Sequence, residues 1–187
     1  DERVLIPRPE TEILILEAKK YITTNSKVLD LCTGSGALAI AISKECNIKV
    51  KASDISYEAI TLAKENALMN NAEVDFIESD LFSNLKEEKF DVIVSNPPYI
   101  KSDDIDNLQK EVKDFEPRVA LDGGVDGLDF YRKIANEAKK HLNKDGVLLL
   151  ECGISQAEEI KTMFDGYSKI EIIKDLEKID RVVKVVL

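Results

Sequence analysis

One short segment combines residue types that suit the chemistry of an amide or amino group. Asn96, Pro97, Pro98 and Tyr99 directly follow the apolar run 92–94. Proline lacks an N–H and forces the preceding residue into an extended conformation, so a strand should end here in a stiff turn with unused carbonyl groups. Those carbonyls and the Asn96 side-chain oxygen would suit a planar NH2 group that donates two hydrogen bonds. For these four residues alone, an ordinary proline-terminated strand is the alternative.

A glycine-rich turn predicts a second binding element, for a nucleotide or nucleoside. The turn follows the apolar run 28–32 and comprises Thr33, Gly34, Ser35 and Gly36, with Ala37 opening a helical segment. Glycines let backbone approach a ligand closely, and the helix that follows presents free N–H groups. Asp54 ends the next strand, about twenty residues on, where an acid typically accepts hydrogen bonds from ribose hydroxyls. Because the same spacing fits a dinucleotide fingerprint, the turn by itself does not choose the ligand.

Two further acids narrow the choice of ligand. Asp30 precedes the turn, where a carboxylate would repel a pyrophosphate but attract the cationic end of an amino acid, which favours S-adenosylmethionine over NAD. Asp80 ends the third strand and could accept the exocyclic amine of an adenine, with Leu81 packing on the ring; a solvated strand-end acid is the alternative. With Asp54 and Asn96, polar residues end four consecutive strands, where an open α/β sheet builds its site.

The remaining pattern supplies the sheet that would position these side chains. Strands are predicted at 28–32, 49–53, 74–77, 90–95, 147–151, 169–174 and 181–187, and helices at 10–21, 37–46, 156–164, in a segment after a Ser56 cap and around 128–142. Strands separated by helices indicate a mainly parallel sheet covered on both faces. No linker or repeat divides the chain, so a single domain is expected.

Composition excludes several classes of function. The 187 residues are 44% hydrophobic and 33% charged, as in a globular protein, and no apolar run approaches the ~20 residues that cross a bilayer. The net charge of −10 argues against a surface that follows phosphate backbones. The three cysteines have no metal-type spacing, so we expect no metal and reduced thiols of a cytoplasmic protein. His141 ends a Lys-rich helix and is predicted to lie on the surface.

The order of these motifs resembles the class I S-adenosylmethionine-dependent methyltransferases. More narrowly, it is similar to the HemK/PrmC-type enzymes that methylate the glutamine of the Gly-Gly-Gln loop in peptide chain release factors. Three other parts of the chain carry the same resemblance: the segments 5–12, 115–128 and 180–183. Cys32 stands where the superfamily often has its first glycine, and it is small enough that the turn should survive.

The resemblance implies a fold, a reaction and a partner. The fold would be α/β and Rossmann-like, with a mostly parallel seven-stranded sheet, helices on both faces and an antiparallel last strand. Residues 1–187 would form the catalytic domain, without the family's N-terminal helical domain that helps to hold the release factor, so the chain should bind cofactor well and protein substrate less well. The release factor would be the partner, with no membrane and no direct nucleic-acid binding.

The resemblance also implies roles for individual residues. Asn96 and the Pro97 carbonyl would each accept one N–H of the substrate amide, and Tyr99 would pack on the amide plane. With Pro98, these residues would bind the substrate. The cofactor residues would be Asp30, Thr33, Gly34, Ser35, Gly36, Ala37, Asp54, Asp80, Leu81 and Asn96. Arg8 and Glu116 are expected either to contact the substrate or to form a structural ion pair or loop anchor.

Three rival functions remain open at this point. An amino-methyltransferase for a nucleic-acid base would also present Asn-Pro-Pro-Tyr to an exocyclic NH2 group, and related enzymes act on a glutamine of a ribosomal protein. An NAD-dependent oxidoreductase would leave Asn96 to Tyr99 without a role. A catalytically silent module that only binds the cofactor is the third.

Overall fold

The strands form one seven-stranded sheet in the order β3-β2-β1-β4-β5-β7-β6. In a computed structural model that describes residues 1–187, the strands are β1 Val28–Leu31, β2 Val50–Asp54, β3 Val74–Glu78, β4 Phe90–Ser95, β5 Leu142–Glu151, β6 Lys169–Lys174 and β7 Asp180–Val186. Pairs from β3 to β5 are parallel, whereas β7 is antiparallel to both β5 and β6. The predicted fold class is therefore confirmed, including the antiparallel last strand.

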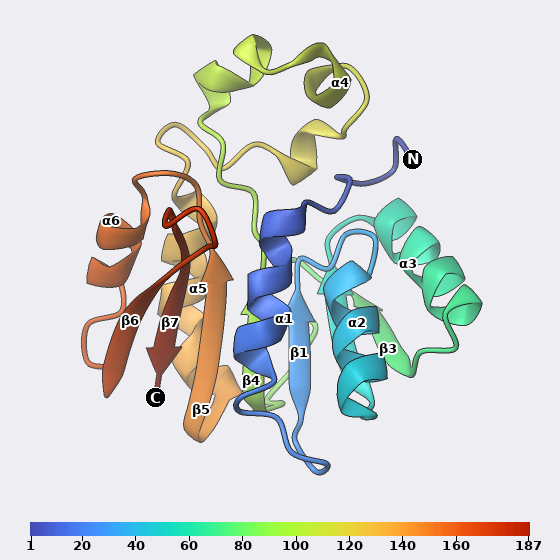
Figure 1. Cartoon of the computed structure of the whole chain (residues 1–187), viewed down its shortest axis with the longest axis vertical. Helices are drawn as coiled ribbons and strands as arrows, with labels where there is room; N and C mark the ends of the chain where they lie inside the picture. Colours follow the sequence, from blue (N-terminus) through green and yellow to red (C-terminus); the bar gives the residue numbers. More distant parts are fainter.

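Helices cover both faces of this sheet (Figure 1). The helices of the whole chain are α1 Glu12–Ala18, α2 Ala37–Cys46, α3 Tyr57–Met69, α4 Lys110–Lys113, α5 Asp129–His141 and α6 Ala157–Thr162. The chain also has 3-10 turns at Pro9–Thr11, Ser102–Asn107 and Arg118–Ala120. Alternate residues of β1 explain the two layers: Val28 joins a core with α1 and α2, and Leu29 joins a core with α5 and α6. A strand buried on both faces is apolar at nearly every position, as the sequence of β1 and β4 indicated.

A segment from 102 to 120, which we call the cap segment, lies above the carboxyl ends of the parallel strands (Figure 1). It contains two 3-10 turns and α4, and an isolated bridge between Ile100 and Asp122 pairs the two stretches of chain that flank it. The strand ends that carry the predicted polar residues therefore face the cap segment. No helix is long and apolar enough to cross a membrane.

Two predictions from the sequence are wrong. The fifth strand begins at Leu142, not after Gly146, because its start pairs with Phe90 before a register shift. His141 is buried, with 5% of its surface exposed; its ring stacks on Phe82 at 4.6 Å between centroids and its Nδ1 lies 2.9 Å from the Glu88 carbonyl oxygen. It lies three residues after Ala138 on the apolar face of α5, and that helical spacing outweighed its Lys-rich surroundings.

Candidate active site

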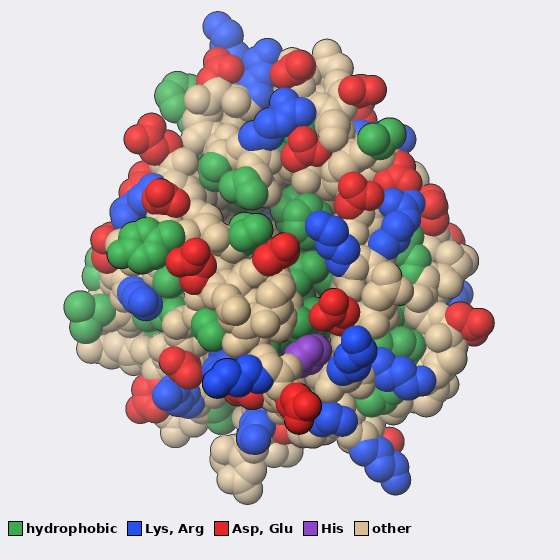
Figure 2. Space-filling view, turned by 180° about the vertical axis from the view of Figure 1, so that it is seen from behind, with side chains coloured by type: hydrophobic (Ala, Val, Ile, Leu, Met, Phe, Trp, Pro, Cys, Tyr) green, Lys and Arg blue, Asp and Glu red, His purple; other side chains and the backbone are tan.

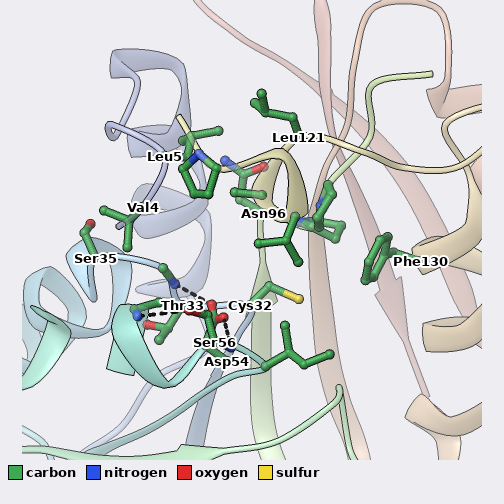
Figure 3. Close-up of a pocket in the computed structure, with 18 of the residues that line it drawn as sticks. Val4, Leu5, Cys32, Thr33, Ser35, Asp54, Ser56, Asn96, Leu121 and Phe130 are labelled. Carbon is green, nitrogen blue, oxygen red and sulfur yellow. Dashed lines mark hydrogen bonds between the residues drawn. The ribbon is translucent and has the colours of Figure 1, made fainter. Parts of the chain in front are cut away.

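A cavity of about 290 Å³ lies between the strand ends and the cap segment. Its lining includes the glycine-rich turn, Asp54 and Leu81 on one side and the Asn-Pro-Pro-Tyr turn on the other. Figure 3 shows these two groups, with Thr33 and Asp54 below, Asn96 above and the Cys32 side chain between them. The volume is near the lower end of the ~300–1,000 Å³ typical of small-molecule sites.

The glycine-rich turn is held by two carboxylates that differ in exposure. Asp54 Oδ2 accepts a hydrogen bond from the Gly34 N–H at 2.8 Å, and its Oδ1 accepts one from the Ser56 N–H at 2.9 Å. A carboxylate has about four acceptor sites, so Asp54, which lines the cavity, keeps acceptor capacity beyond these two bonds. Burial raises the pKa of Asp54, while the hydrogen bonds from Ser56 and Gly34 lower it. The carboxylate is thus fixed in direction and can still accept hydroxyl groups.

Asp30 lies beneath the turn and does not line the cavity. Its Oδ2 accepts hydrogen bonds from the Thr33 hydroxyl at 2.6 Å and from the Ala39 N–H at 3.1 Å, whereas its Oδ1 is buried with no partner. Burial raises the pKa of Asp30 to about 7, against the lowering effect of those two hydrogen bonds. Asp30 Oδ1 is thus a buried acceptor that no group of the chain satisfies, and the cofactor role expected for Asp30 stays a prediction.

The two glycines of the turn have different tasks. Gly34 lines the cavity with a φ of +53° and open space where a side chain would stand. Gly36 does not line it: with a φ of +81°, an added Cβ would lie 3.1 Å from the Ala63 Cβ, so glycine lets the start of α2 pack against α3. Cys32 adopts a φ of +62°, which explains why glycine suits this position and confirms that the turn survives with cysteine.

Asp80 and Leu81 complete the side of the cavity that contains the glycine-rich turn and Asp54. Asp80 is exposed at the cavity edge, and Leu81 is 91% buried with a φ of +48°. A left-handed conformation is costly for a bulky residue and persists where its surroundings hold it. Here the Ser79 hydroxyl donates to the Leu81 carbonyl at 2.7 Å. This hydrogen bond supports the left-handed conformation of Leu81, which lines the cavity.

The Asn-Pro-Pro-Tyr turn offers two free acceptors. Asn96 Nδ2 donates to the Thr11 hydroxyl at 3.3 Å, while neither Asn96 Oδ1 nor the Pro97 carbonyl oxygen accepts a hydrogen bond within the chain. The chain continues from Ser95, whose hydroxyl donates to the Leu31 carbonyl at 2.6 Å and ties β4 to β1. Both oxygens are therefore unused within the chain, and their role as acceptors for a substrate amide stays a prediction.

Tyr99 is held from behind by two glycines and Gln156. A Cβ on Gly123 would lie 2.8 Å from the Tyr99 Cα, and one on Gly127 would lie 2.5 Å from the Tyr99 carbonyl oxygen. Gln156 Nε2 donates to that oxygen at 3.0 Å. Burial and the nearby charge of Glu151 raise the pKa of Tyr99 to about 12, so its hydroxyl stays neutral.

Arg8 and Glu116 form an ion pair. The Arg8 guanidinium, which lines the cavity, lies 2.6 Å from Oε1 of Glu116, a residue that is 6% exposed. The pair joins the N-terminal segment to the cap segment. Of the expectations for these residues, the structural ion pair is the one observed. No group of three or more His, Cys, Asp or Glu side chains is placed to hold a metal ion.

Comparison with known proteins identifies the family to which the chain is similar. The family model described as the methyltransferase small domain matches residues 9–113. The chain is 46% identical to the release factor glutamine methyltransferase of Thermodesulfovibrio yellowstonii over 187 residues, covering 96% of this chain and 67% of that protein. It is 45% identical to that of Clostridium acetobutylicum, covering 98% of this chain and 67% of that protein.

The chain belongs to the release factor glutamine methyltransferase family. It spans about two thirds of the length of these curated relatives. Its fold is also that of a methyltransferase from Pyrococcus furiosus, with a TM-score of 0.72, 24% identity, and coverage of 97% of this chain and 84% of the other. Like its family, the chain uses S-adenosylmethionine as cofactor.

Several residues at this site were not predicted from the sequence. Thr11, Ser56 and Phe130 line the cavity, and Glu151 lies directly behind Asn96. Only Glu151 had a signal in the sequence, because it is an acid at the end of a buried strand, as Asp54 is at the end of β2. The others come from loops and helix starts whose approach to the cavity depends on the whole fold.

Proposed function

We propose that this chain transfers the methyl group of S-adenosylmethionine to the side-chain amide nitrogen of the glutamine in the Gly-Gly-Gln loop of a peptide chain release factor. The observation that carries the proposal is the pair of unused acceptors, Asn96 Oδ1 and the Pro97 carbonyl oxygen, beside the cavity of about 290 Å³. The names of the relatives supply the substrate.

The other half of the cavity fits the cofactor. The Asp54 carboxylate suits ribose hydroxyls, Leu81 offers an apolar surface to an adenine, and Asp80 stands at the edge for its amine. The turn residues Thr33, Gly34, Ser35 and Ala37 line the space between, and the unpartnered Asp30 Oδ1 lies beneath them. When bound, S-adenosylmethionine supplies an electrophilic methyl group.

The substrate amide is a poor nucleophile because its nitrogen lone pair is delocalised into the carbonyl. Asn96 Oδ1 and the Pro97 carbonyl oxygen would each accept one of its N–H groups, which fixes the nitrogen and favours a pyramidal geometry. The Tyr99 ring, with its hydroxyl neutral and its main chain backed by Gly123 and Gly127, would pack on the amide plane. Rate would come from positioning and from acceptors that match the positive charge growing on nitrogen.

Domain and partner follow from the same proposal. Residues 1–187 would form the catalytic domain, acting in the cytoplasm on a protein loop. Figure 2 shows one face of the molecule, where Lys and Arg side chains are interspersed with Asp and Glu. Together with a net charge of −10, that distribution favours a protein over a nucleic acid as partner.

A methyl-transfer assay with labelled S-adenosylmethionine tests the proposal. The chain is incubated in parallel with a release factor, the same release factor with its Gly-Gly-Gln glutamine replaced by alanine, ribosomal protein, and tRNA or duplex DNA. We expect label only in the intact release factor. Label in ribosomal protein or nucleic acid would transfer the proposal to that substrate, and cofactor binding without any label would mark a silent module.

Retention on nucleic acid gives an independent check. We expect no appreciable binding of the cofactor-loaded chain to tRNA or duplex DNA at physiological salt. Binding driven by phosphates would appear at low salt and fall steeply as salt rises. A sub-micromolar, salt-sensitive complex would favour a nucleic-acid substrate.

A further inference from the structure

Glu151 is a buried acid that the proposed reaction does not yet use. It ends β5, is 1% exposed, and its Oε2 has no hydrogen-bond partner. It does not line the cavity, so it is not placed to contact a ligand there. A buried acid with an unused oxygen is costly, and such a group in a folded protein calls for an explanation.

The sheet places Glu151 directly behind Asn96. Ser95 of β4 pairs with Leu150 of β5, so the next residue on each strand, Asn96 and Glu151, emerge side by side. Thr11 is the third member of the cluster, since its hydroxyl oxygen accepts a hydrogen bond from Asn96 Nδ2 at 3.3 Å. Hydrogen bonding from Thr11 and Asn96 and the charge of Arg181 lower the pKa of Glu151, although burial raises it more and Glu10 adds to the rise.

The hydrogen-bond capacities of these three groups favour one arrangement when Glu151 is ionised. An ionised carboxylate can only accept, and a hydroxyl has one proton to donate. If the Thr11 proton points to Glu151, the oxygen lone pairs of Thr11 face Asn96. Asn96 must then present its NH2 group to Thr11, which directs its Oδ1 away from Glu151.

We propose that Glu151 is a positioning residue that, through Thr11, holds the Asn96 amide with its oxygen toward the substrate amide. This inference rests on the proposed function for its reaction, but the orientation of Asn96 is a property of the chain itself. The two ends of an asparagine amide are nearly equal in shape and opposite in hydrogen bonding. A flipped Asn96 would set its own NH2 group against the NH2 group of the substrate and lose the acceptor that the chemistry needs.

Two nearly isosteric substitutions test the chain of contacts. Glu151→Gln supplies an NH2 group that can donate to Thr11, which lets Thr11 donate to Asn96 and favours the flipped amide. Thr11→Val removes the hydroxyl and keeps the shape. We expect each to lower single-turnover methylation of a release factor by about 10- to 100-fold, the scale of a small misplacement in a site. The dissociation constant for S-adenosylmethionine should stay within about twofold.

Further variants separate positioning from stability. Thr11→Ser should recover most of the turnover that Thr11→Val loses, and the double variant Glu151→Gln with Thr11→Val should lose little more than either alone, because both act on one chain of contacts. Glu171→Gln makes the same chemical change in an acid of β6 that is paired with Lys184 of β7, and it should leave turnover unchanged. The melting temperature reports any general loss of structure.

The side-chain amide signals of Asn96 in a ¹⁵N spectrum, identified by their loss in Asn96→Asp, supply a measurement without substrate. We expect slow exchange with solvent in the parent chain and faster exchange or a new shift in Glu151→Gln. Unchanged Asn96 signals together with normal turnover in Glu151→Gln would overturn the inference, as would a uniform loss of turnover, cofactor affinity and melting temperature. If the parent chain methylates no release factor but the Asn96 signals respond as expected, the proposed function fails and the positioning role stands.

Discussion

The two halves of the cavity are held together over very different distances in the sequence. The cofactor half is fixed by short-range contacts: Asp30 with Thr33 and Ala39, and Asp54 with Ser56 and Gly34, at most 20 residues apart. The Asn-Pro-Pro-Tyr half is fixed by long-range contacts: Tyr99 with Gln156, Asn96 with Thr11, and Arg8 with Glu116, which are 57, 85 and 108 residues apart.

This difference separates two kinds of preorganisation. Except for Asp80 and Leu81, the cofactor half belongs to the unit β1–α2–β2, in which the carboxylates accept N–H groups of the glycine-rich turn and of the helix that follows it. The other half requires the N-terminal segment, β4, β5 and α6 to meet, so its geometry depends on the complete fold. We therefore expect substitutions in the first half to change mainly cofactor affinity, and substitutions in the second to change mainly turnover.

Asn96→Ala should produce the largest effect. It removes an acceptor that is used only when the substrate amide is held, so we expect turnover to fall by about 10²–10³, as for deletion of one preorganised polar group. Cofactor affinity should change much less, because most cofactor contacts lie in the other half. Single-turnover methylation and calorimetry on the same variant measure both quantities. Near-normal turnover would mean that Asn96 only terminates a strand.

The contrast between the halves also explains what the sequence could predict. The bounds of β6 and α2, the Ser56 cap that accepts the Ala59 N–H, and the approach of Asp54 to the turn follow from local patterns. Parallel strands then bring polar strand ends to one edge without any further information. The fold and the cofactor half were therefore accessible from residues near one another.

Long-range packing decided the rest. His141 is buried because α5 places it against Phe82, a residue of a distant loop. The start of β5 at Leu142 depends on its pairing with Phe90, which no local pattern encodes. The roles of Gly123 and Gly127 became visible only where Tyr99 lies against them. Sequence periodicity reports which face of an element is apolar, but not which distant residue will meet it.

Asp54→Ala should have the largest effect within the cofactor half. Loss of hydrogen bonds to a charged group costs about 1.5–3 kcal/mol, so we expect the affinity for S-adenosylmethionine to fall about 10- to 150-fold. Turnover at saturating cofactor should fall far less. Asp75→Ala, which removes an exposed acid from the neighbouring strand, is the matched control. Unchanged affinity in a folded Asp54→Ala variant would reject this placement of the ribose.

Asp30→Asn should change how stability depends on pH. The pKa of Asp30 is raised by burial to about 7, whereas an unfolded chain releases this proton near pH 4. Between these values the folded state binds more protons, so this group makes stability fall as pH rises, by at most about 1.4 kcal/mol per pH unit. Asparagine keeps an acceptor for Thr33 and Ala39 and has no charge. The free energy of unfolding of Asp30→Asn, relative to that of the parent chain, should therefore rise from pH 4 to pH 7. If the two free energies ran parallel with pH, the raised pKa of Asp30 would be contradicted.

Gln156→Leu should have the smallest effect. It should change both stability and turnover, because Gln156 belongs to the Asn-Pro-Pro-Tyr half, which is fixed by long-range contacts. Gln156 Nε2 donates to the carbonyls of Tyr99 and Gly127 at 3.0 and 3.2 Å, and its Oε1 accepts from the Gly153 N–H at 2.9 Å. Leucine has a similar volume but satisfies none of them, so we expect a loss of about 1–3 kcal/mol in the free energy of unfolding.

Turnover in Gln156→Leu should fall only a few-fold, because Gly123 and Gly127 still back the Tyr99 main chain. Gln109→Leu is the matched control, since Gln109 is exposed and its side chain makes no hydrogen bond, so both quantities should stay at the parent values. Urea unfolding and single-turnover methylation measure the pair. If Gln156→Leu weakened S-adenosylmethionine binding as strongly as Asp54→Ala does, the two halves would be one coupled unit and the division drawn between them would be wrong.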